Sequence, residues 1–394
     1  MRCNFCGAEW TLPYQMKIEE CPFCKKRLAK IAVKTRVAVH APKITRTTRR
    51  EDFDIVGTVL RSYKGTDPVV YVPEGITELG MIKPGTGAFY ENKFVQKIVL
   101  PKSLRAISPK AFASSTVQEV VFSDGIVSIS DHAFENSDLR QITLPATVNV
   151  IGNSAFRRCR NLGEVVLPAG LNEIGDFAFE ECTKLFAITL PARVNSIGQS
   201  AFKKCFALQK INIPTTLTQI GNYAFANTGL EAITIPGSIT KIPLGCFSHC
   251  LKLKSLNLQR GINTIGDYSF SNCKALTEVL LPEGISYLDD GAFEECHYLT
   301  RVVIPDSVIR IVATQYYSYG ARPGTFHNCT ALVDVTYPVK RFDPQIFASS
   351  QYYNRAVERK KQSDAIMIAE GKCPKCNEKF SFWTKRCRKC GMQY

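Results

Sequence analysis

Apolar residues recur along the middle of the chain with a period of 22 or 23 positions. The stretch PAGLNEIGDFAFEECTKLFAITL, which begins at Pro168, shows one unit with Leu171, Ile174 and Phe179 as landmarks. The proline recurs at positions 101, 145, 168, 191, 214, 236, 282 and 305, and in nine units, from Phe112 to Phe293, a phenylalanine stands eleven residues after the proline or its equivalent. A fixed period of this length predicts a stack of repeats that share one continuous core.

Each unit ends in a short alternating segment. In the unit above, Ile188 and Leu190 fall on one side of an extended chain, and Ala187 and Thr189 fall on the other. Alternation with period two over so few residues predicts a short β-strand. The Ile-Gly and Ala-Phe pairs are expected to turn the chain back, with glycine supplying backbone freedom. Neighbouring units should therefore stack their strands into one parallel sheet.

The combination of the proline, Ile-Gly, Ala-Phe, Cys and leucine positions resembles the BspA-like class of leucine-rich repeats, which is common in bacteria and some protists. The resemblance covers roughly residues 51 to 347, and the segment FDIVGTVLRSYKGTDPVVYVPEGITELG is similar to the N-terminal cap of that class. It implies a leucine-rich-repeat solenoid, an α/β-type repeat horseshoe with a parallel sheet of short strands and about a dozen units. It also implies a surface that binds other macromolecules, without naming one.

The expected concave face carries small residues and charges of both signs. Its exposed column includes the partner-binding candidates Glu164, Lys210, Glu278 and Arg301. A second feature is the insertion TQYYSYGARP, in which Tyr316, Tyr317 and Tyr319 offer a recognition loop, although the loop could equally shield the last repeats. Since no stripe of lysine and arginine follows the repeats, this face favours a protein partner over a nucleic acid.

Seven cysteines recur fourteen residues after the proline or at the matching place in the lengthened unit. We interpret them as small buried packing residues, with a metal or redox ladder as the alternative. Stacked thiols would risk cross-linking in an oxidising compartment, which favours a reducing one. The column consists of Cys159, Cys182, Cys205, Cys250, Cys273, Cys296 and Cys329, and Cys246 replaces an alanine of the repeat.

Both ends of the chain carry paired C-x2-C knuckles. Four thiolates make a closed tetrahedral zinc site, which is structural because it leaves no position for water or substrate. Each end resembles a zinc ribbon, which gives two Zn2+ per chain. The predicted ligands are Cys3, Cys6, Cys21 and Cys24 at one end, and Cys373, Cys376, Cys387 and Cys390 at the other.

The formal net charge of +15 belongs to these ends. Residues 1–50 hold 12 Lys+Arg against 3 Asp+Glu, and residues 351–394 hold 11 against 4. The segment 25–50 has ten basic residues and no acidic one, which is typical of a solvated linker but also of some nucleic-acid binders. Trp10 and Trp383 either cover the zinc sites or stack on a base. The nucleic-acid alternative uses these two tryptophans together with Lys25, Lys26, Arg27, Arg46, Arg49 and Arg50.

These observations divide the chain into five parts. We expect an N-terminal zinc ribbon (1–28), a basic linker or short strand (29–50), the repeats (51–348), a helical cap or linker that starts at Ser349 or Ser350 (349–371), and a C-terminal zinc ribbon (372–394). A shorter insertion near residues 81 to 87 is interpreted as part of the N-terminal capping.

The function expected from the sequence is that of a non-enzymatic intracellular scaffold. No phosphate-cradling loop, dinucleotide fingerprint, nucleophile elbow or H-E-x-x-H motif is present in the sequence. No signal-like segment or apolar run of about 18 residues occurs either, so we expect a cytoplasmic protein without a membrane span. The solenoid would bind a protein, and the ribbons would act as structural or recruiting modules. The alternatives are an adaptor that holds DNA or RNA, and a surface-exposed adhesin-like protein.

Overall fold

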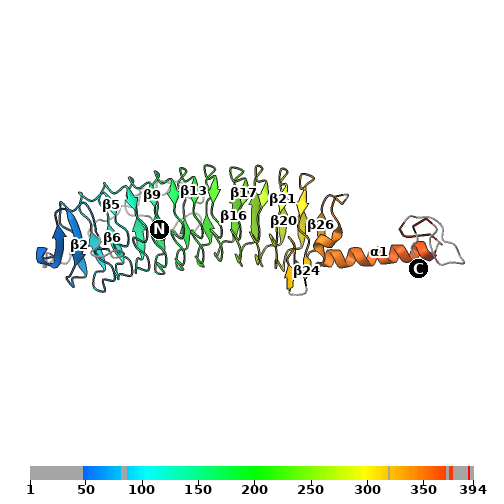
Figure 1. Cartoon of the computed structure of the whole chain (residues 1–394), viewed down its shortest axis with the longest axis horizontal. Coiled ribbons are helices and arrows are strands. Elements are labelled where there is room, and N and C mark those ends of the chain that lie inside the picture. Colours follow the sequence, from blue (N-terminus) through cyan, green and yellow to red (C-terminus); the bar gives the residue numbers. More distant parts are fainter. Residues whose placement is uncertain are drawn as a thin grey trace, which may run out of the picture. The chain divides into compact units, whose positions relative to one another are not determined.

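A computed structural model describes residues 48–80, 87–317, 320–339, 341–369, 372–375 and 389–390. The chain divides after Thr47 into two units, and every described residue belongs to the second, which begins at Thr48. This unit is a solenoid in which short parallel strands from successive repeats lie side by side (Figure 1).

Each repeat contributes two strands, one to each of two faces. The first series forms the long-strand face, where strands pair in parallel and in register within five short sheets, as in Ala232↔Ser255. Its members are β3 (Val69–Tyr71), β4 (Lys97–Val99), β6 (Glu119–Val121), β8 (Gln141–Thr143), β10 (Glu164–Val166), β12 (Ala187–Ile188), β14 (Lys210–Ile211), β16 (Ala232–Ile235), β18 (Ser255–Leu258), β20 (Glu278–Leu280), β22 (Arg301–Val303) and β26 (Asp334–Thr336).

The second series forms the short-strand face, made of two-residue strands in ladders of six and four. Its members are β5 (Ala106–Ile107), β7 (Ser128–Ile129), β9 (Val150–Ile151), β11 (Glu173–Ile174), β13 (Ser196–Ile197), β15 (Gln219–Ile220), β17 (Lys241–Ile242), β19 (Thr264–Ile265), β21 (Tyr287–Leu288) and β23 (Arg310–Ile311). The expectation that the Ile-Gly pair only turns the chain was wrong, because the isoleucine side of that pair ends a strand.

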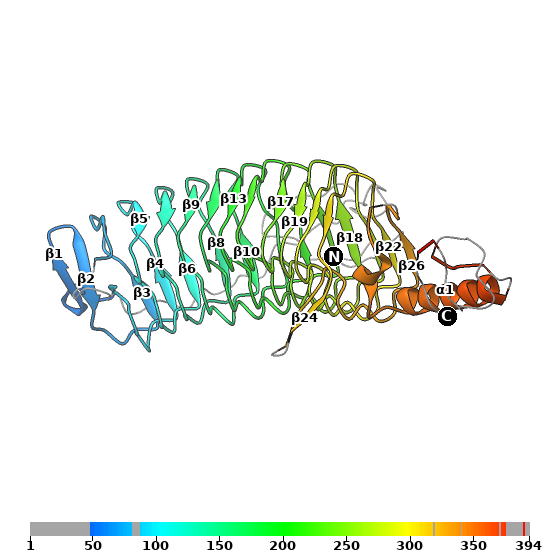
Figure 2. The same cartoon turned by 45° about the vertical axis from the view of Figure 1, so that its right-hand side comes forward.

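The expected α/β-type horseshoe is also corrected. Between residues 87 and 317 the described chain contains strands and turns but no helix, so the fold is a parallel-sheet β-solenoid. Figure 2 shows the two strand series joined by loops along the whole stack. The nine turns from Phe112 to Phe293 have the regular length. The expected dozen is reached only by counting the irregular turns at the two ends, which hold Phe89, Phe326 and Phe347.

The phenylalanines form one stacked column through the core. From Phe89 to Phe326, neighbouring ring centroids lie 5.0–5.5 Å apart with nearly parallel planes. Two left-handed residues flank each ring from Phe112 to Phe293, two positions before and two positions after it, as at Tyr223 and Asn227. They bend the chain around the column, and the loops that they form are called the turn edge below.

The cysteine column lies beside the phenylalanines, as predicted for packing residues. All eight repeat cysteines are fully buried. The structure adds a role that the sequence did not indicate, because each column thiol donates to a phenylalanine carbonyl oxygen of the preceding turn, as Cys159 Sγ does to Phe134 at 3.0 Å. The corresponding pairs are Cys182–Phe156, Cys205–Phe179, Cys250–Phe225, Cys273–Phe247, Cys296–Phe270 and Cys329–Phe293.

One boundary between turns is looser than its neighbours. Strands β15 and β17 do not pair, although every other adjacent pair on the short-strand face does. In neighbouring turns the glycine N–H donates to an isoleucine carbonyl of the preceding turn, as Gly221 does to Ile197 at 2.8 Å. Pro243 occupies the glycine position and has no N–H to donate. Ile220 is only half-buried there, whereas Ile197 is buried. We call this boundary the seam.

The turn edge remains intact across the seam. Phe225 N donates to Cys246 O at 2.9 Å, and the rings of Phe225 and Phe247 stack at 5.3 Å. The seam is therefore open on the short-strand face and closed along the phenylalanine column.

Two different structures close the ends of the stack. At the N-terminal end, the short 3-10 helix η1 (Arg50–Asp52) leads into the antiparallel pair β1 (Phe53–Val56) and β2 (Val59–Tyr63), and the Tyr63 ring packs on Phe89. At the C-terminal end, the 3-10 helix η2 (Pro344–Phe347) places Phe347 on Phe326, and helix α1 (Gln351–Ala369) follows. The expected start near Ser349 or Ser350 is confirmed, because Ser350 Oγ accepts from Tyr353 N at 3.1 Å as an N-cap.

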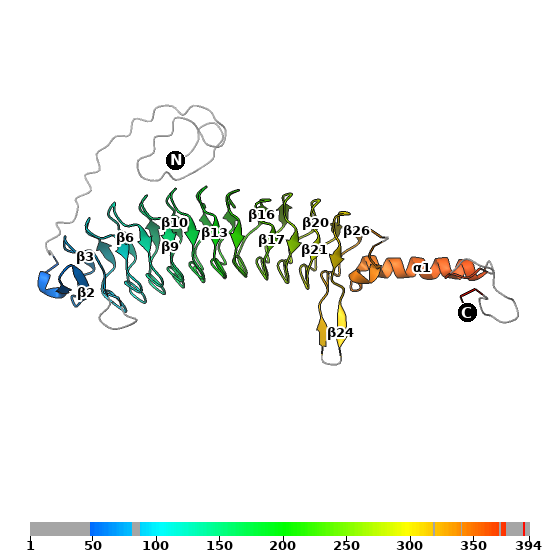
Figure 3. The same ribbon diagram turned by 45° about the horizontal axis from the view of Figure 1, so that its top comes forward.

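The tyrosine-rich insertion is a hairpin and not a loop. Strands β24 (Gln315–Tyr317) and β25 (Gly320–Arg322) pair antiparallel, and Figure 3 shows them leaving the stack of turns. The insertion near residues 81 to 87 lies almost wholly outside the described residues.

Candidate interaction face

The long-strand face carries the residues that the sequence assigned to partner binding. The alternation within each strand turns one set of side chains into the core and the other to solvent, as in the pattern exposed, buried, exposed of β8. The predicted exposed column is confirmed at every position. It consists of Gln141, Glu164, Ala187, Lys210, Ala232, Ser255, Glu278, Arg301 and Asp334.

The structure brings two of the four charged candidates together. Arg301 lies between Glu278, at 3.6 Å, and Asp334, at 3.2 Å, on the adjacent strands β20 and β26. These side chains are half exposed or more, so the pairs contribute little to stability. Glu164 and Lys210 form no ion pair within the described residues, and their charges are available to a partner.

Sequence reasoning missed two aromatic side chains at the margin of this face. Phe186 immediately precedes β12 and is 51% exposed, and Phe206 in the next turn is 54% exposed. Gln209 N donates to Phe186 O, which ties the two turns together. Val166, on β10 in the preceding turn, is 56% exposed. The sequence could have indicated these two residues, because most other repeats have a polar or small residue at the positions of Phe186 and Phe206.

The tyrosines of the insertion are placed only in part. Tyr316 and Tyr317 belong to β24, and Tyr319 lies outside the described residues. Their role in recognition stays a prediction.

Two of the predicted zinc ligands are described, and their sulfur atoms lie close together. Cys373 Sγ is 3.5 Å from Cys390 Sγ. Four thiolates at about 2.3 Å from a tetrahedral zinc ion stand about 3.8 Å apart, whereas a disulfide joins sulfurs at about 2.05 Å. The spacing fits shared metal ligation better than a disulfide. The six remaining ligands, Cys3, Cys6, Cys21, Cys24, Cys376 and Cys387, lie outside the described residues.

The described part of the chain holds no cluster of three or more His, Cys, Asp or Glu side chains suited to a metal. None of its helices has the length and apolar character needed to cross a membrane. Of the nucleic-acid candidates only Arg49 and Arg50 are described, and Arg49 pairs with Glu51 at 3.3 Å. Lys25, Lys26, Arg27, Arg46, Trp10 and Trp383 lie outside the described residues.

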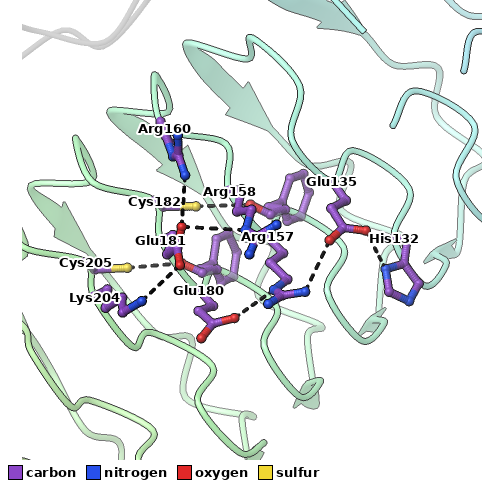
Figure 4. Close-up of polar contacts among 12 residues, drawn as sticks. His132, Glu135, Arg157, Arg158, Arg160, Glu180, Glu181, Cys182, Lys204 and Cys205 are labelled. Atoms are coloured by element: carbon purple, nitrogen blue, oxygen red, sulfur yellow. Dashed lines mark hydrogen bonds and ion pairs between the residues drawn. The ribbon is translucent and has the colours of Figure 1, made fainter. Parts of the chain in front are cut away.

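A network of charges crosses the turn edge (Figure 4). Arg157 bonds Glu180 at 2.7 Å and Glu135 at 3.4 Å, and His132 Nδ1 lies 2.7 Å from Glu135. This row links three consecutive turns and was not anticipated from the sequence.

The second part of the network centres on Glu181, which lies between cations from the preceding and the following turn. Lys204 and Arg160 each approach its carboxylate at 3.1 Å. Burial would raise the pKa of Glu181, but the hydrogen bonds from Lys204 and Arg160 outweigh burial and hold the pKa below its ordinary value.

Comparison with known families matches most of the repeat region. A family model described as a BspA type leucine-rich repeat region, in six copies, matches residues 83–209 and 195–322. Comparison with curated proteins gives no match.

Comparison with solved structures finds similarity to several proteins. A leucine-rich repeat protein from Bacteroides ovatus is 21% identical, with 74% of this chain and 91% of that chain covered and a TM-score of 0.40. The pneumococcal vaccine antigen PcpA is 18% identical, with 75% and 87% covered and a TM-score of 0.49. A leucine-rich cell surface protein from Faecalibacterium prausnitzii is 21% identical, with 74% and 92% covered and a TM-score of 0.39.

Proposed function

The chain belongs to the BspA-type leucine-rich repeat family, and from this premise we propose that it is a non-enzymatic scaffold whose long-strand face binds a protein. The observation that carries the proposal is the presence of exposed large apolar side chains on three consecutive turns. Val166, Phe186 and Phe206 each expose about half of their surface, and Glu164 on β10 and Lys210 on β14 add charges that have no ion pair within the described residues.

This combination suits protein recognition for physical reasons. Exposed aromatic side chains on a rigid scaffold act as anchors, because they bury a large area and have few rotamers to immobilise. Charges at the margin steer a partner and select its orientation, more than they add affinity. Val166 lies on β10, and Phe186 and Phe206 lie in the loops that lead into β12 and β14. The stacked core fixes these strands, so little ordering is needed when a partner binds.

The test is capture of proteins by the full chain and two variants. Phe186→Ser combined with Phe206→Ser should lose the captured protein, whereas Ile309→Ser, which removes an equally exposed apolar side chain from the short-strand face, should keep it. Bound protein is compared by mass spectrometry with and without nuclease. Retention of every captured protein by the double variant would overturn the assignment of this face.

The nucleic-acid adaptor is the second candidate, and the acid-free segment 25–50 is the observation that favours it. Binding of DNA or RNA through this segment should weaken steeply with salt and should disappear when residues 25–50 are replaced by a neutral linker. A partner that is retained after nuclease treatment and after that replacement would argue for the protein scaffold.

We also propose that each terminal cysteine set holds one structural Zn2+. The 3.5 Å approach of Cys373 and Cys390 supports this for the C-terminal set. Metal analysis of purified protein should give about two zinc ions per chain, and Cys373→Ser with Cys390→Ser should remove one. Chelation should unfold only the ends, since segments of about two dozen residues have little core of their own. A metal content that is unchanged in the double variant would contradict the site.

A cytoplasmic location is a further proposal. In the folded chain the column thiols are buried, so the argument for a reducing compartment concerns the folding chain, in which neighbouring thiols are exposed together. Cell fractionation with an antibody to the solenoid tests it, and recovery in the surface fraction would favour the adhesin-like alternative.

A further inference from the structure

Ring-bearing and small residues alternate along the turn edge, outside the long-strand face that we propose binds a protein. Two positions before each stacked phenylalanine, the left-handed residue is alternately a ring and a small side chain over eight turns. The rings, which we call the ring row, are His132, Phe177, Tyr223 and Tyr268. The small residues between and after them are Ser154, Ser200, Gly245 and Gly291.

The rings lie over the small residues of the next turn. A Cβ atom added to Gly245 would collide with the ring of Tyr223, and one added to Gly291 would come within 2.7 Å of the ring of Tyr268. The two glycines are buried, whereas the two rings are half-exposed. Each ring is therefore held against the edge by the turn that it covers.

The spacing of the rings follows from the repeat. Successive rings are two turns apart, and neighbouring strands of a sheet are about 4.8 Å apart, so the ring row has a step of about 10 Å. Such a step is comparable with the length of a disaccharide unit in an extended, β-linked glycan. A saccharide chain that lies along the solenoid would meet a ring at every second sugar.

A column of hydrogen-bonding side chains runs directly beside the rings. The residue before each ring or small residue is Asp131, Asn153, Asp176, Gln199, Asn222, Asp267 or Asp290, with Leu244 as the exception. One oxygen of several of these side chains accepts from the backbone N–H of the next turn, as Asp176 Oδ1 does from Gln199 at 2.6 Å. Asn153 Oδ1 accepts from Asp176 N at 2.8 Å. These bonds fix the side chains and leave their second polar atom for a ligand.

A hollow of about 360 Å3 lies where the two columns meet. It is lined by His132, Asn153, Ser154, Arg157, Asp176 and Phe177. Arg157 is held by Glu135 and Glu180 (Figure 4). Its guanidinium stands 5.7 Å from the centre of the Phe177 ring. The hollow thus combines an apolar wall with fixed hydrogen-bond donors and acceptors, which is the composition of small-ligand sites.

The charge of this edge decides which ligand fits. The column beside the rings holds four aspartates and no lysine or arginine. The cation nearest the hollow, Arg157, is already neutralised by two carboxylates. These aspartates disfavour a polyanion such as a nucleic acid, although Lys203 stands 5.5 Å from the centre of the Tyr223 ring and aromatic rows also suit stacked bases. Sugar hydroxyls both donate and accept hydrogen bonds, and the C–H face of a sugar ring packs on the electron-rich face of an aromatic ring.

From these observations we propose that the turn edge between His132 and Tyr268 is a binding site for an extended, uncharged saccharide chain. The ring row supplies the stacking surfaces, and the aspartate and asparagine column binds the hydroxyl groups. The site lies in the turns and not on the long-strand face, so it is independent of the proposed protein scaffold and could operate together with it.

The experiment measures binding of four soluble β-linked hexasaccharides, of glucose, N-acetylglucosamine, xylose and mannose, to the full chain by saturation-transfer NMR and calorimetry. At least one is expected to bind. Tyr223→Ser combined with Tyr268→Ser should weaken that binding by about tenfold or more, since two stacking contacts are lost. Serine is tolerated at this position, because Ser154 and Ser200 adopt the same left-handed conformation.

Tyr298→Ser is the matched control, because it removes a 65% exposed tyrosine that is not in the ring row and should leave binding unchanged. Asp176→Asn keeps the oxygen that caps Gln199 but alters the second polar atom, and it should weaken binding several-fold. Failure of all four saccharides to bind would overturn the proposal. Equal binding by the double variant, or displacement of the saccharide by oligothymidylate, would overturn it as well.

Discussion

At the scale of single residues, the buried thiols combine packing with hydrogen bonding. Each column cysteine fills a position that is inaccessible to solvent and donates to a carbonyl oxygen of the preceding turn. Burial raises the pKa of Cys159 to about 12 and that of Cys250 to about 11. Serine and threonine hold the same place at Ser115, Ser137 and Thr228, where a small donor is again available.

These thiols should be unreactive in the folded chain. Iodoacetamide at pH 8 attacks the thiolate, and a raised pKa together with burial keeps the eight repeat cysteines protonated and inaccessible. Mass spectrometry of the native protein should therefore find no alkylation at these eight positions, and denaturant should expose all of them. Rapid labelling of Cys205 in the native protein would show that the column opens.

Glu181 gives a prediction with a defined pH dependence. Its lowered pKa in the folded chain means that it adds stability above the unfolded value of about 4.3, and that this contribution is lost as the pH falls through the folded value. Glu181→Gln should lower the free energy of unfolding by about 1 kcal/mol at pH 7. The deficit should shrink in acid.

Denaturant titrations of Glu181→Gln at pH 7 and in acid measure this difference. Glu164→Gln, at an exposed position without an ion pair in the described residues, is the control and should change little at either pH. If the loss of unfolding free energy in Glu181→Gln grew as the pH falls, the pKa of Glu181 in the folded chain could not be lowered, and the prediction would be wrong.

At the scale of elements, the seam is the one place where the described ladder of the short-strand face loses continuity. Pro243 removes one donor, and Ile211 and Ile220 on the preceding turn are only half-buried. Strands of two residues have few hydrogen bonds, so the loss of one donor matters more than it would in a longer strand. The seam should open before other boundaries between turns.

Hydrogen exchange tests this expectation. Peptides that cover β17 should exchange faster than the equivalent peptides of β13 and β19, because their amides lack partners on the preceding turn. Pro243→Gly restores the N–H that Gly221 and Gly266 use and should slow exchange around β17. Equal exchange rates at β13, β17 and β19, unchanged by the substitution, would show that the seam does not open before the other boundaries.

The comparison of sequence with structure is also clearest for elements. The phenylalanine period and the alternation of the first strand series could be predicted, because each depends on local patterns that recur unchanged. The second strand series could not, since a two-residue strand leaves too short a pattern to separate from a turn. The turn-edge ion pairs at Glu135 and Glu181 depend on contacts between residues more than 20 positions apart, which only the stacking register specifies.

The whole molecule is a stack that depends on its ends being closed. In a solenoid each turn is stabilised by its neighbours, so the terminal turns lose half of that support. Tyr63 covers Phe89 at one end. At the other end, Tyr352 packs edge-on against Phe347 at 5.7 Å and against Tyr337 at 6.3 Å.

Tyr352→Ala should therefore destabilise the C-terminal turns. The loss of two edge-on aromatic contacts and of partly buried area should lower the free energy of unfolding by about 1–2 kcal/mol. Ile366→Ala removes an apolar side chain that is 61% exposed from the same helix and should change stability by less than about 0.5 kcal/mol. Equal effects of the two substitutions in thermal and denaturant unfolding would show that α1 does not close the stack.

The alternation in the turn edge constrains how such a molecule can be lengthened. Every turn of regular length presents matching upper and lower surfaces, so duplication of one 23-residue segment in the gene would preserve the core. It would also place two rings or two small residues in succession. Successive rings are 45 or 46 residues apart, which makes a pair of turns the smallest insertion that preserves the order of this edge. If the protein grew by pairs of turns, a ring would therefore still occur at every second turn of the longer ring row.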